Sequence, residues 1–367
     1  MKKKWIHPLI VLLIAMTIAS CSKKEVTPVQ VNTILTQATK AALEKAADSV
    51  FMAVNTPGMI ALISVEGEGD YLVKRGVSNI VTDEPMNVDN YFRIGSITKT
   101  FVGTAILILV DEGKIKLDSS ISHYLPECNV PNGDHITIRN LGTMSSGLFD
   151  YTHDSLWLDD LYQSNFLMPF TPQSLLAYAF RHPSDTTMPG IKYDYCNTNL
   201  ILLGLLMEKV TGKTVEEVVE EKVVIPMNLK HTFWPNSIFL FSPYTHGYYF
   251  VNDKFQDASN WNPSWCGAAG IMVSTIPDLK QWVKALAEGK FLSDDMKAER
   301  LKLVGGFYGF CLMKHGDWVG HTGSIYGYNT IALFNTAKRI TLLINVTTNF
   351  LLPATAYYAA FRKILDR

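Results

Sequence analysis

Apolar residues recur at helical spacing near the start of the chain, and this periodicity predicts a helix over residues 34–54. Pro57 and Gly58 end the pattern. Two runs with strand character follow at 59–65 and 71–77, and a short polar turn with two glycines separates them. Two such runs around a glycine-containing turn predict a β-hairpin.

Helical periods and long loops fill the middle of the chain, and strand-like runs return near its end. The expected helices are 96–112, 175–180, 198–210, 215–224, 278–288 and 353–364, and the expected late strands are 308–314, 318–322, 328–334 and 340–346. We therefore expect an α+β fold in which the early hairpin and the late strands share one antiparallel sheet. N- and C-terminal helices flank that sheet, and a helical region is inserted between its two parts.

The composition is that of a globular protein. Hydrophobic residues make up 47% of the 367 residues and charged residues 18%, and the formal net charge is -1. These values exclude a disordered chain, and they provide no basic excess for nucleic-acid binding.

The first residues have the pattern of a targeting segment. Lysines at 2–4 precede an apolar run at 10–16, and small residues at 18–20 lead directly to Cys21. The apolar run is shorter than the roughly 20 residues that a membrane-spanning helix needs. The segment resembles a bacterial lipoprotein signal, and an uncleaved membrane anchor is the alternative.

That resemblance implies that residues 1–20 are removed, that Cys21 is lipidated and that a polar tether, 21–32, leads to a single domain over 33–367. We expect a protein anchored by lipid in the bacterial cell envelope, on the periplasmic side, with the outer membrane favoured in a Gram-negative cell. Four further cysteines would lie in an oxidising compartment, but their wide spacing defines no pairs. We expect no metal site, because the sequence contains neither C-x-x-C nor H-E-x-x-H.

Ser96 and Lys99 carry the first chemical signal. They are three residues apart, and the apolar helical run 101–110 follows them. At this spacing a hydroxyl and an amine share one face of a helix start. A half-buried lysine can remove the proton that makes serine a poor nucleophile. The alternative is that Ser96 only caps the helix and that Lys99 is solvated.

Two later stretches add to this signal. Tyr195 and Asn197 lie just before an expected helix, and in extended backbone their side chains would point the same way. A phenol beside a lysine ammonium can act as a base, and an amide can hold a lysine or a substrate carbonyl. Without other signals, a structural tyrosine-rich loop would be the better interpretation of this stretch.

The second stretch is His321 to Ser324, at the end of an expected strand. Gly323 would let a substrate backbone lie alongside the strand, and the backbone N–H of Ser324 is available to an oxyanion. By itself, His321 is better interpreted as a structural histidine.

The order Ser-x-x-Lys, Tyr-x-Asn and His-x-Gly resembles the serine β-lactamase-like family, which includes penicillin-binding D,D-peptidases, class C β-lactamases and related esterases. The resemblance covers roughly residues 33–365 and extends to Ser145-Ser146-Gly147 and to 267–275. It implies that Ser96 forms an acyl-enzyme and that Lys99 and Tyr195 transfer protons. Asn197 would orient the lysine and the substrate, and no metal or organic cofactor would be needed.

Two residues depart from the pattern. Cys196 stands where serine is frequent, and we expect it to point away from the site. His321 replaces the lysine that is usual in class C β-lactamases, which weakens the case for an efficient β-lactamase because histidine is mostly neutral near pH 7. We expect Cys196 and Cys266 to flank the cleft. A disulfide between them is a guess, because the sequence gives it no support.

The resemblance leaves three functions open. The leading one is a D-alanyl-D-alanine carboxypeptidase or related D-amino-acid peptidase, whose substrate would be a small peptide such as a peptidoglycan stem peptide. The second is a carboxylesterase or a β-lactamase on the same scaffold. The third is a non-catalytic sensor that binds penicillin or muropeptides. We expect the aromatic residues of the loops between 150 and 262 to decide the substrate, although each of them alone is better explained by packing. They are Tyr151, Trp157, Tyr162, Phe166, Trp234, Tyr244, Tyr248 and Trp261.

Overall fold

The computed structural model describes residue 1, residues 33–187 and residues 189–367, and one compact unit spans Ile34–Arg367. The expected signal peptide, Cys21 and the tether lie outside the described residues. Within the described part of the chain, no helix is both long and apolar enough to span a bilayer.

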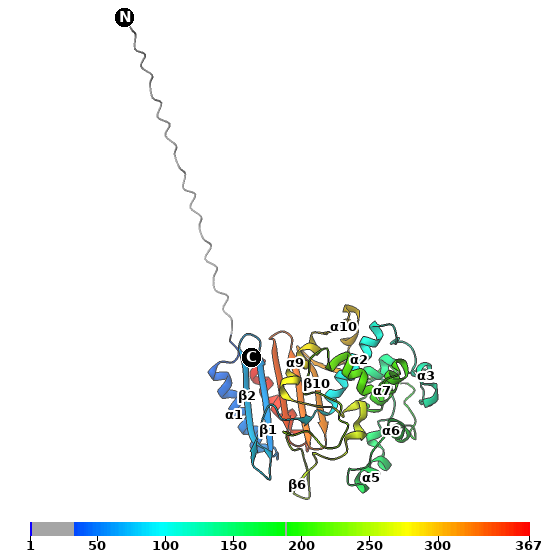
Figure 1. The fold of residues 1–367 in the computed structure, drawn as a ribbon, viewed down its shortest axis with the longest axis horizontal. Helices are drawn as coiled ribbons and strands as arrows, with labels where there is room; N and C mark the ends of the chain where they lie inside the picture. Colours follow the sequence, from blue (N-terminus) through cyan, green and yellow to red (C-terminus); the bar gives the residue numbers. More distant parts are fainter. Residues whose placement is uncertain (2–32, 188) are drawn as a thin grey trace. The chain divides into compact units, whose positions relative to one another are not determined.

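An eight-stranded antiparallel sheet has the strand order β3-β2-β1-β12-β11-β10-β9-β8 (Figure 1). The strands are β1 (Gly58–Val65), β2 (Gly69–Asn79), β3 (Glu84–Pro85), β8 (Tyr308–Gly309), β9 (Leu312–His315), β10 (Trp318–Ile325), β11 (Tyr328–Asn335) and β12 (Ile340–Val346). β1 pairs with β12, and Leu62 lies opposite Leu343. This pairing confirms that the early hairpin and the late strands share one sheet.

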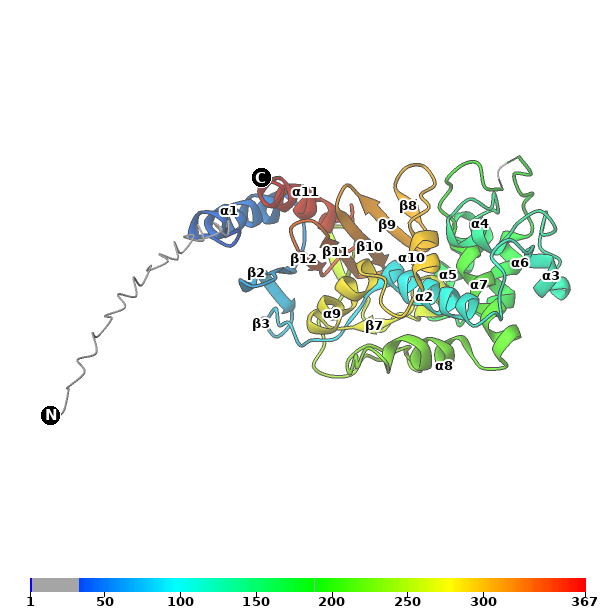
Figure 2. The same ribbon diagram turned by 90° about the horizontal axis from the view of Figure 1, so that it is seen from above.

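Helices cover both faces of this sheet. α1 (Gln37–Ala53) and α11 (Pro353–Leu365) pack together on one face, and α9 (Ile276–Ala287) packs against β10, β11 and β12 on the other (Figure 2). Every residue of β1, β11 and β12 is buried, which explains why these strands read as nearly continuous apolar runs.

The inserted region is mainly helical. It contains α2 (Thr98–Asp111), α3 (Ile121–Tyr124), α4 (Ile138–Gly142), α5 (Ser155–Gln163), α6 (Pro172–Ala179), α7 (Thr198–Thr211) and α8 (Val215–Val219), together with the π-helical turn η4 (Glu220–Val224). Two short sheets, β4 (Phe92–Arg93) with β7 (Val273–Ser274) and β5 (Tyr248–Val251) with β6 (Lys254–Asp257), lie outside the main sheet. α5 and α10 (Asp294–Arg300) were not expected, because both contain paired aspartates and α10 lacks a clear apolar period.

The prediction of a single strand over 308–314 is wrong. The structure has two strands there, β8 and β9, with a turn between them. Phe310 is fully buried in that turn, and Cys311 has a φ of 54°. The backbone N–H of Cys311 donates to the carbonyl of Gly142 in α4. This contact with a distant helix interrupts the strand, and the local sequence gives no sign of it.

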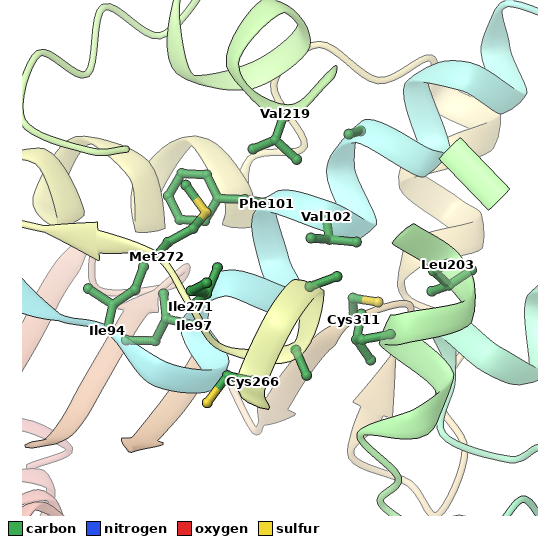
Figure 3. Close-up of a cluster of buried hydrophobic side chains, with 14 of the residues drawn as sticks. Ile94, Ile97, Phe101, Val102, Leu203, Val219, Cys266, Ile271, Met272 and Cys311 are labelled. Carbon is green, nitrogen blue, oxygen red and sulfur yellow. The ribbon is translucent and has the colours of Figure 1, made fainter. Parts of the chain in front are cut away.

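A buried cluster fixes the start of α2. Ile94, Ile97, Phe101 and Met272 lie in this cluster (Figure 3), and Phe101 stacks on Trp282 of α9 with ring centroids 4.1 Å apart. The backbone N–H of Ile94 donates to the carbonyl of Met272. The segment just before α2 is therefore held by the buried cluster and by a backbone hydrogen bond to Met272.

Candidate active site

Ser96 lies in a 3₁₀ turn, η1 (Gly95–Ile97), immediately before α2. Gly95 has a φ of 52°, and a Cβ there would lie 2.7 Å from the backbone nitrogen of Ser324. Only glycine allows this conformation and this close approach of β10 to the turn. The Ser96 side chain is bonded to Lys99 and Tyr195, and the capping position of α2 is occupied by Ile97. The interpretation of Ser96 as a helix cap is therefore wrong.

Lys99 is fully buried, so the alternative that it is solvated is also wrong. Its Nζ lies 2.9 Å from Ser96 Oγ, 2.8 Å from Asn197 Oδ1 and 2.7 Å from the carbonyl oxygen of Ala269. Burial disfavours the ammonium form and lowers the pKa of Lys99 to about 8. A substantial fraction of this lysine is therefore neutral in mildly alkaline solution.

The neighbours of Lys99 determine where its lone pair points. The carbonyl of Ala269 and Oδ1 of Asn197 can only accept hydrogen bonds. A neutral amine has two N–H bonds, and these two acceptors use both of them. The lone pair then points at the third neighbour, Ser96 Oγ. The neutral form of Lys99 is thus oriented to take the serine proton.

Tyr195 donates its hydroxyl to Ser96 Oγ at 2.8 Å, and Lys99 Nζ lies 4.9 Å from the centre of its ring. Burial raises the pKa of Tyr195 far above its usual value. Burial in this environment therefore opposes the phenolate that Tyr195 would need in order to act as a base. Tyr195 is a proton donor here, and Lys99 is the better base.

Asn197 depends on a carboxylate that the sequence analysis missed. Asp150 Oδ2 accepts from both the backbone N–H and Nδ2 of Asn197, each at 2.9 Å. These bonds direct Nδ2 away from Lys99 and turn Oδ1 toward it. The two side chains at 195 and 197 converge as expected, although Asn197 has helical rather than extended dihedrals.

His321 is 2% exposed, and both ring nitrogens have partners. Nδ1 lies 2.5 Å from the carbonyl of Thr322, and Nε2 lies 3.0 Å from the hydroxyl of Tyr308. The carbonyl can only accept, so Nδ1 carries the proton and Nε2 accepts from Tyr308. Burial and the nearby Lys99 lower the pKa of His321 to about 3. His321 is thus a neutral, fully bonded side chain.

Gly323 has a packing role that the sequence did not indicate. A Cβ there would lie 2.0 Å from the carbonyl oxygen of Ile94, so this glycine lets β10 pack against the segment that carries Ser96. β9 pairs with β10 only at Trp318–Gly320, whereas β11 pairs along all of β10. Of the described strands, none pairs with the β9-side edge of β10 beyond Gly320, where Thr322 and Ser324 line a cavity.

That cavity has a volume of about 530 Å³ and contains Ser96, Tyr195, Asn197 and His321 in its lining. Cys266 also lines it, as expected. Cys196 is buried and does not line it, so the expectation that it points away from the site is confirmed and the expectation that it flanks the cleft is wrong. Both cysteines are free, so the disulfide guessed from the sequence is not formed. Within the described residues, no group of three or more His, Cys, Asp or Glu side chains could hold a metal ion.

Two of the eight loop aromatics considered in the sequence analysis, Tyr151 and Trp157, line the cavity. The others do not, and Trp261 stacks on Phe166 with ring centroids 3.7 Å apart. Trp265 and Tyr326 also line the cavity but were missed, because neither belongs to a motif with a known spacing.

The fold and this site define a serine hydrolase in which a buried lysine and a tyrosine both contact the nucleophile. The family model described as Beta-lactamase matches residues 41–365. The chain therefore belongs to the Beta-lactamase family, and the resemblance found in the sequence is confirmed.

Several known proteins are similar to this chain. A solved D-stereospecific amidohydrolase from Streptomyces sp. is 30% identical, with a TM-score of 0.77 over 88% of this chain and 97% of that one. A D-amino acid amidase from Ochrobactrum anthropi SV3 has the same fold, with 24% identity, a TM-score of 0.75 and coverage of 90% of this chain and 99% of that one.

Among curated proteins, a D-aminopeptidase from Brucella anthropi is 28% identical over 76% of this chain and 56% of its own length. A β-lactamase from Pseudomonas fluorescens is 30% identical over 52% of this chain and 49% of its own length. The chain thus spans about half the length of the curated relatives that it matches.

Proposed function

We propose that this hydrolase cleaves amide bonds at the carbonyl of D-configured amino acids and forms an acyl-enzyme on Ser96. The observation that carries the proposal is the contact of Ser96 Oγ with both Lys99 Nζ and the Tyr195 hydroxyl. The similarity to a D-stereospecific amidohydrolase along nearly the whole of that protein supports the choice of D-amino-acid substrates.

In the proposed reaction, neutral Lys99 takes the proton of Ser96 as Oγ attacks the carbonyl carbon. The backbone N–H groups of Ser96 and Ser324 would stabilise the oxyanion, because the serine turn and β10 are in direct contact. Tyr195 then donates its proton to the departing nitrogen and regains one from the lysine ammonium. Water hydrolyses the ester by the same transfers in reverse.

The neutral state of His321 favours substrates without a carboxylate, and this argues against two of the functions left open by the sequence. A D-alanyl-D-alanine carboxypeptidase and a β-lactamase both act on substrates with a carboxylate, and a neutral His321 with both nitrogens bonded offers that carboxylate no cation. Both alternatives remain outcomes of the test below.

The test begins with a fluorophosphonate probe, followed by intact mass. We expect one adduct on the parent protein and none on Ser96→Ala. Turnover is then compared for D- and L-phenylalaninamide, for their N-acetyl forms, for N-acetyl-D-Ala-D-Ala and for a chromogenic cephalosporin. A D over L preference supports the proposal, whereas a preference for the L-amides contradicts it. A preference for N-acetyl-D-Ala-D-Ala would identify a carboxypeptidase within the proposed class, and a preference for the cephalosporin would identify a β-lactamase and contradict the proposal. Product release that stops at one equivalent per protein would identify the sensor.

We also propose that the mature protein is anchored through lipidated Cys21 on the periplasmic side of a bacterial membrane. The support is the sequence pattern of residues 2–21. Expression in a bacterium, followed by intact mass of the membrane fraction, tests this: lipid should be attached to the parent and absent from Cys21→Ser. Equal membrane retention of both proteins, with residues 1–20 still attached, would identify an uncleaved anchor.

A further inference from the structure

The cavity beside Ser96 is lined, among the described residues, without a single Asp, Glu, Lys or Arg. His321 is the lining residue most able to become a cation, but burial keeps its pKa at about 3. Both of its nitrogens are already bonded within the protein. The cavity therefore offers a substrate neither a positive nor a negative partner at neutral pH.

In the described part of the chain, the charged residues of the catalytic network are Lys99 and Asp150, and neither lines the cavity. The Nζ of Lys99 is surrounded by three acceptors of the protein itself. Asp150 accepts four hydrogen bonds, two from Thr152 and two from Asn197. These charges are used to hold the site together, and they leave no free donor or acceptor for a charged group of the substrate.

Aromatic side chains form a continuous wall of this cavity, which we call the aromatic wall: Tyr151, Trp157, Trp265 and Tyr326. Ring centroids are 5.8 Å apart for Tyr151 and Trp157, and 5.5 Å apart both for Trp157 with Trp265 and for Trp265 with Tyr326. The Tyr151 hydroxyl donates to the carbonyl of Trp265, which satisfies its polar atom internally. The wall therefore offers mainly apolar and aromatic contacts to a substrate.

From these features we infer that the preferred substrate is uncharged on both sides of the scissile carbonyl. It would be an N-acylated D-amino acid with an aromatic or other apolar side chain, joined to an amide or ester leaving group that has no carboxylate. A free ammonium or carboxylate would lose its hydration in this cavity without gaining an ionic partner. The inference rests on the proposed function, since acylation of Ser96 is what brings the substrate beside the aromatic wall.

Two matched pairs of compounds test this substrate class. The first pair is N-acetyl-D-phenylalaninamide and D-phenylalaninamide at pH 6.5, where the free amine is protonated. The second pair is N-acetyl-D-Ala-D-alaninamide and N-acetyl-D-Ala-D-Ala, which differ only in the terminal carboxylate. We expect kcat/KM to be at least tenfold higher for the uncharged member of each pair. A higher value for the charged member of either pair would overturn the inference.

Binding to Ser96→Ala separates this inference from the proposed function. Titration calorimetry with the same four compounds should give tighter binding of the uncharged member of each pair. If none is hydrolysed by the parent protein but this ranking holds, the proposed function fails, and the ranking shows separately that the cavity prefers uncharged ligands. If the D-amides are hydrolysed but the charged members bind more tightly, the inference fails and the proposed function stands.

A gain of charge provides the complementary test. Thr322 lies half-buried on the free edge of β10 and lines the cavity. The quantity to compare is kcat/KM for N-acetyl-D-Ala-D-Ala divided by kcat/KM for its amide. This ratio should be about tenfold higher in Thr322→Lys than in Thr322→Gln, a neutral variant of similar length. An equal ratio in the two variants would show that carboxylate exclusion does not arise from the missing cation, and it would contradict the inference.

Discussion

Asp150 and Asn197 are joined by two hydrogen bonds to a single carboxylate oxygen, from the backbone N–H and from the side-chain amide. This pair fixes which atom of the amide faces Lys99. The negative charge of Asp150 also raises the pKa of Lys99, against the larger lowering effect of burial. Asp150 is therefore a positioning residue with an electrostatic effect on the base.

That relationship predicts the behaviour of Asp150→Asn. Loss of the charge removes a contribution that favours the ammonium, so the pKa of Lys99 should fall and the alkaline rise in activity should move to lower pH. Because the Asn197 amide is also held less firmly, kcat should fall about tenfold with little change in KM. A full pH profile of kcat and KM checks both effects. An unchanged midpoint together with a lower kcat would indicate a purely structural role.

The parent protein should show a pH dependence set by Lys99. Only the neutral amine can accept the serine proton, and burial places the pKa of Lys99 at about 8. The rate of Ser96 acylation should therefore rise with pH, with a midpoint near 8, and remain low below pH 7. Measurement of kcat/KM from pH 6 to 10 checks this. Lys99→Arg, whose side chain stays charged, should be inactive throughout; a midpoint near 10 would mean that Lys99 is solvated in the working enzyme.

Tyr195→Phe should show whether Tyr195 acts in the attack of Ser96 on the carbonyl or in protonation of the leaving group. The phenylalanine keeps the ring but removes the hydroxyl that contacts Ser96 Oγ. Amide hydrolysis needs a proton on the leaving nitrogen, so turnover should fall about 10²–10⁴-fold. Fluorophosphonate labelling releases fluoride, which needs no such proton, and it should slow much less. If labelling and amide turnover fell equally, Tyr195 would act in the attack rather than on the leaving group.

His321 should make the folded state sensitive to acid. Its pKa is about 3 in the fold and about 6.5 when exposed, so the unfolded chain binds a proton between these values and the folded chain does not. Stability is therefore lost as the pH falls through this window, by about 2 kcal/mol between pH 7 and pH 5. Denaturant unfolding at both pH values, for the parent and His321→Gln, checks this. Between these pH values, the free energy of unfolding of His321→Gln should fall by about 2 kcal/mol less than that of the parent. An equal fall in both proteins would show that His321 does not contribute.

The parts of the site that depend on local chemistry could be predicted from the sequence. Ser96 and Lys99 are one helical turn apart, so their spacing alone was enough to bring them together. Tyr195 and Asn197 were correctly paired with them because the order of motifs matched a known family. The fold was also predicted well, since β1, β11 and β12 are buried strands with clear apolar runs.

The remaining parts of the site depend on contacts between distant segments. Asp150 lies 47 positions from Asn197, and a single aspartate carries no signal of such a partner. Asp150 does follow Ser145-Ser146-Gly147, which belongs to the stretches that resemble the family. This position in the sequence was the one sign that Asp150 lies near the site. The packing role of Gly323 was missed for a similar reason, because the carbonyl of Ile94 that it accommodates belongs to another element.

The pairing of β1 with β12 has a consequence for how the molecule is made. During synthesis, the β1–β2 hairpin emerges first and its inner edge stays unpaired until almost the whole chain has been produced. The Ser96 turn likewise forms its contact with β10 only after the inserted helices have emerged. Strands whose pairing partners are synthesised much later fold slowly, and their apolar edges stay exposed for longer. Truncations that remove β10 to β12 should therefore yield aggregates rather than smaller folded hydrolases.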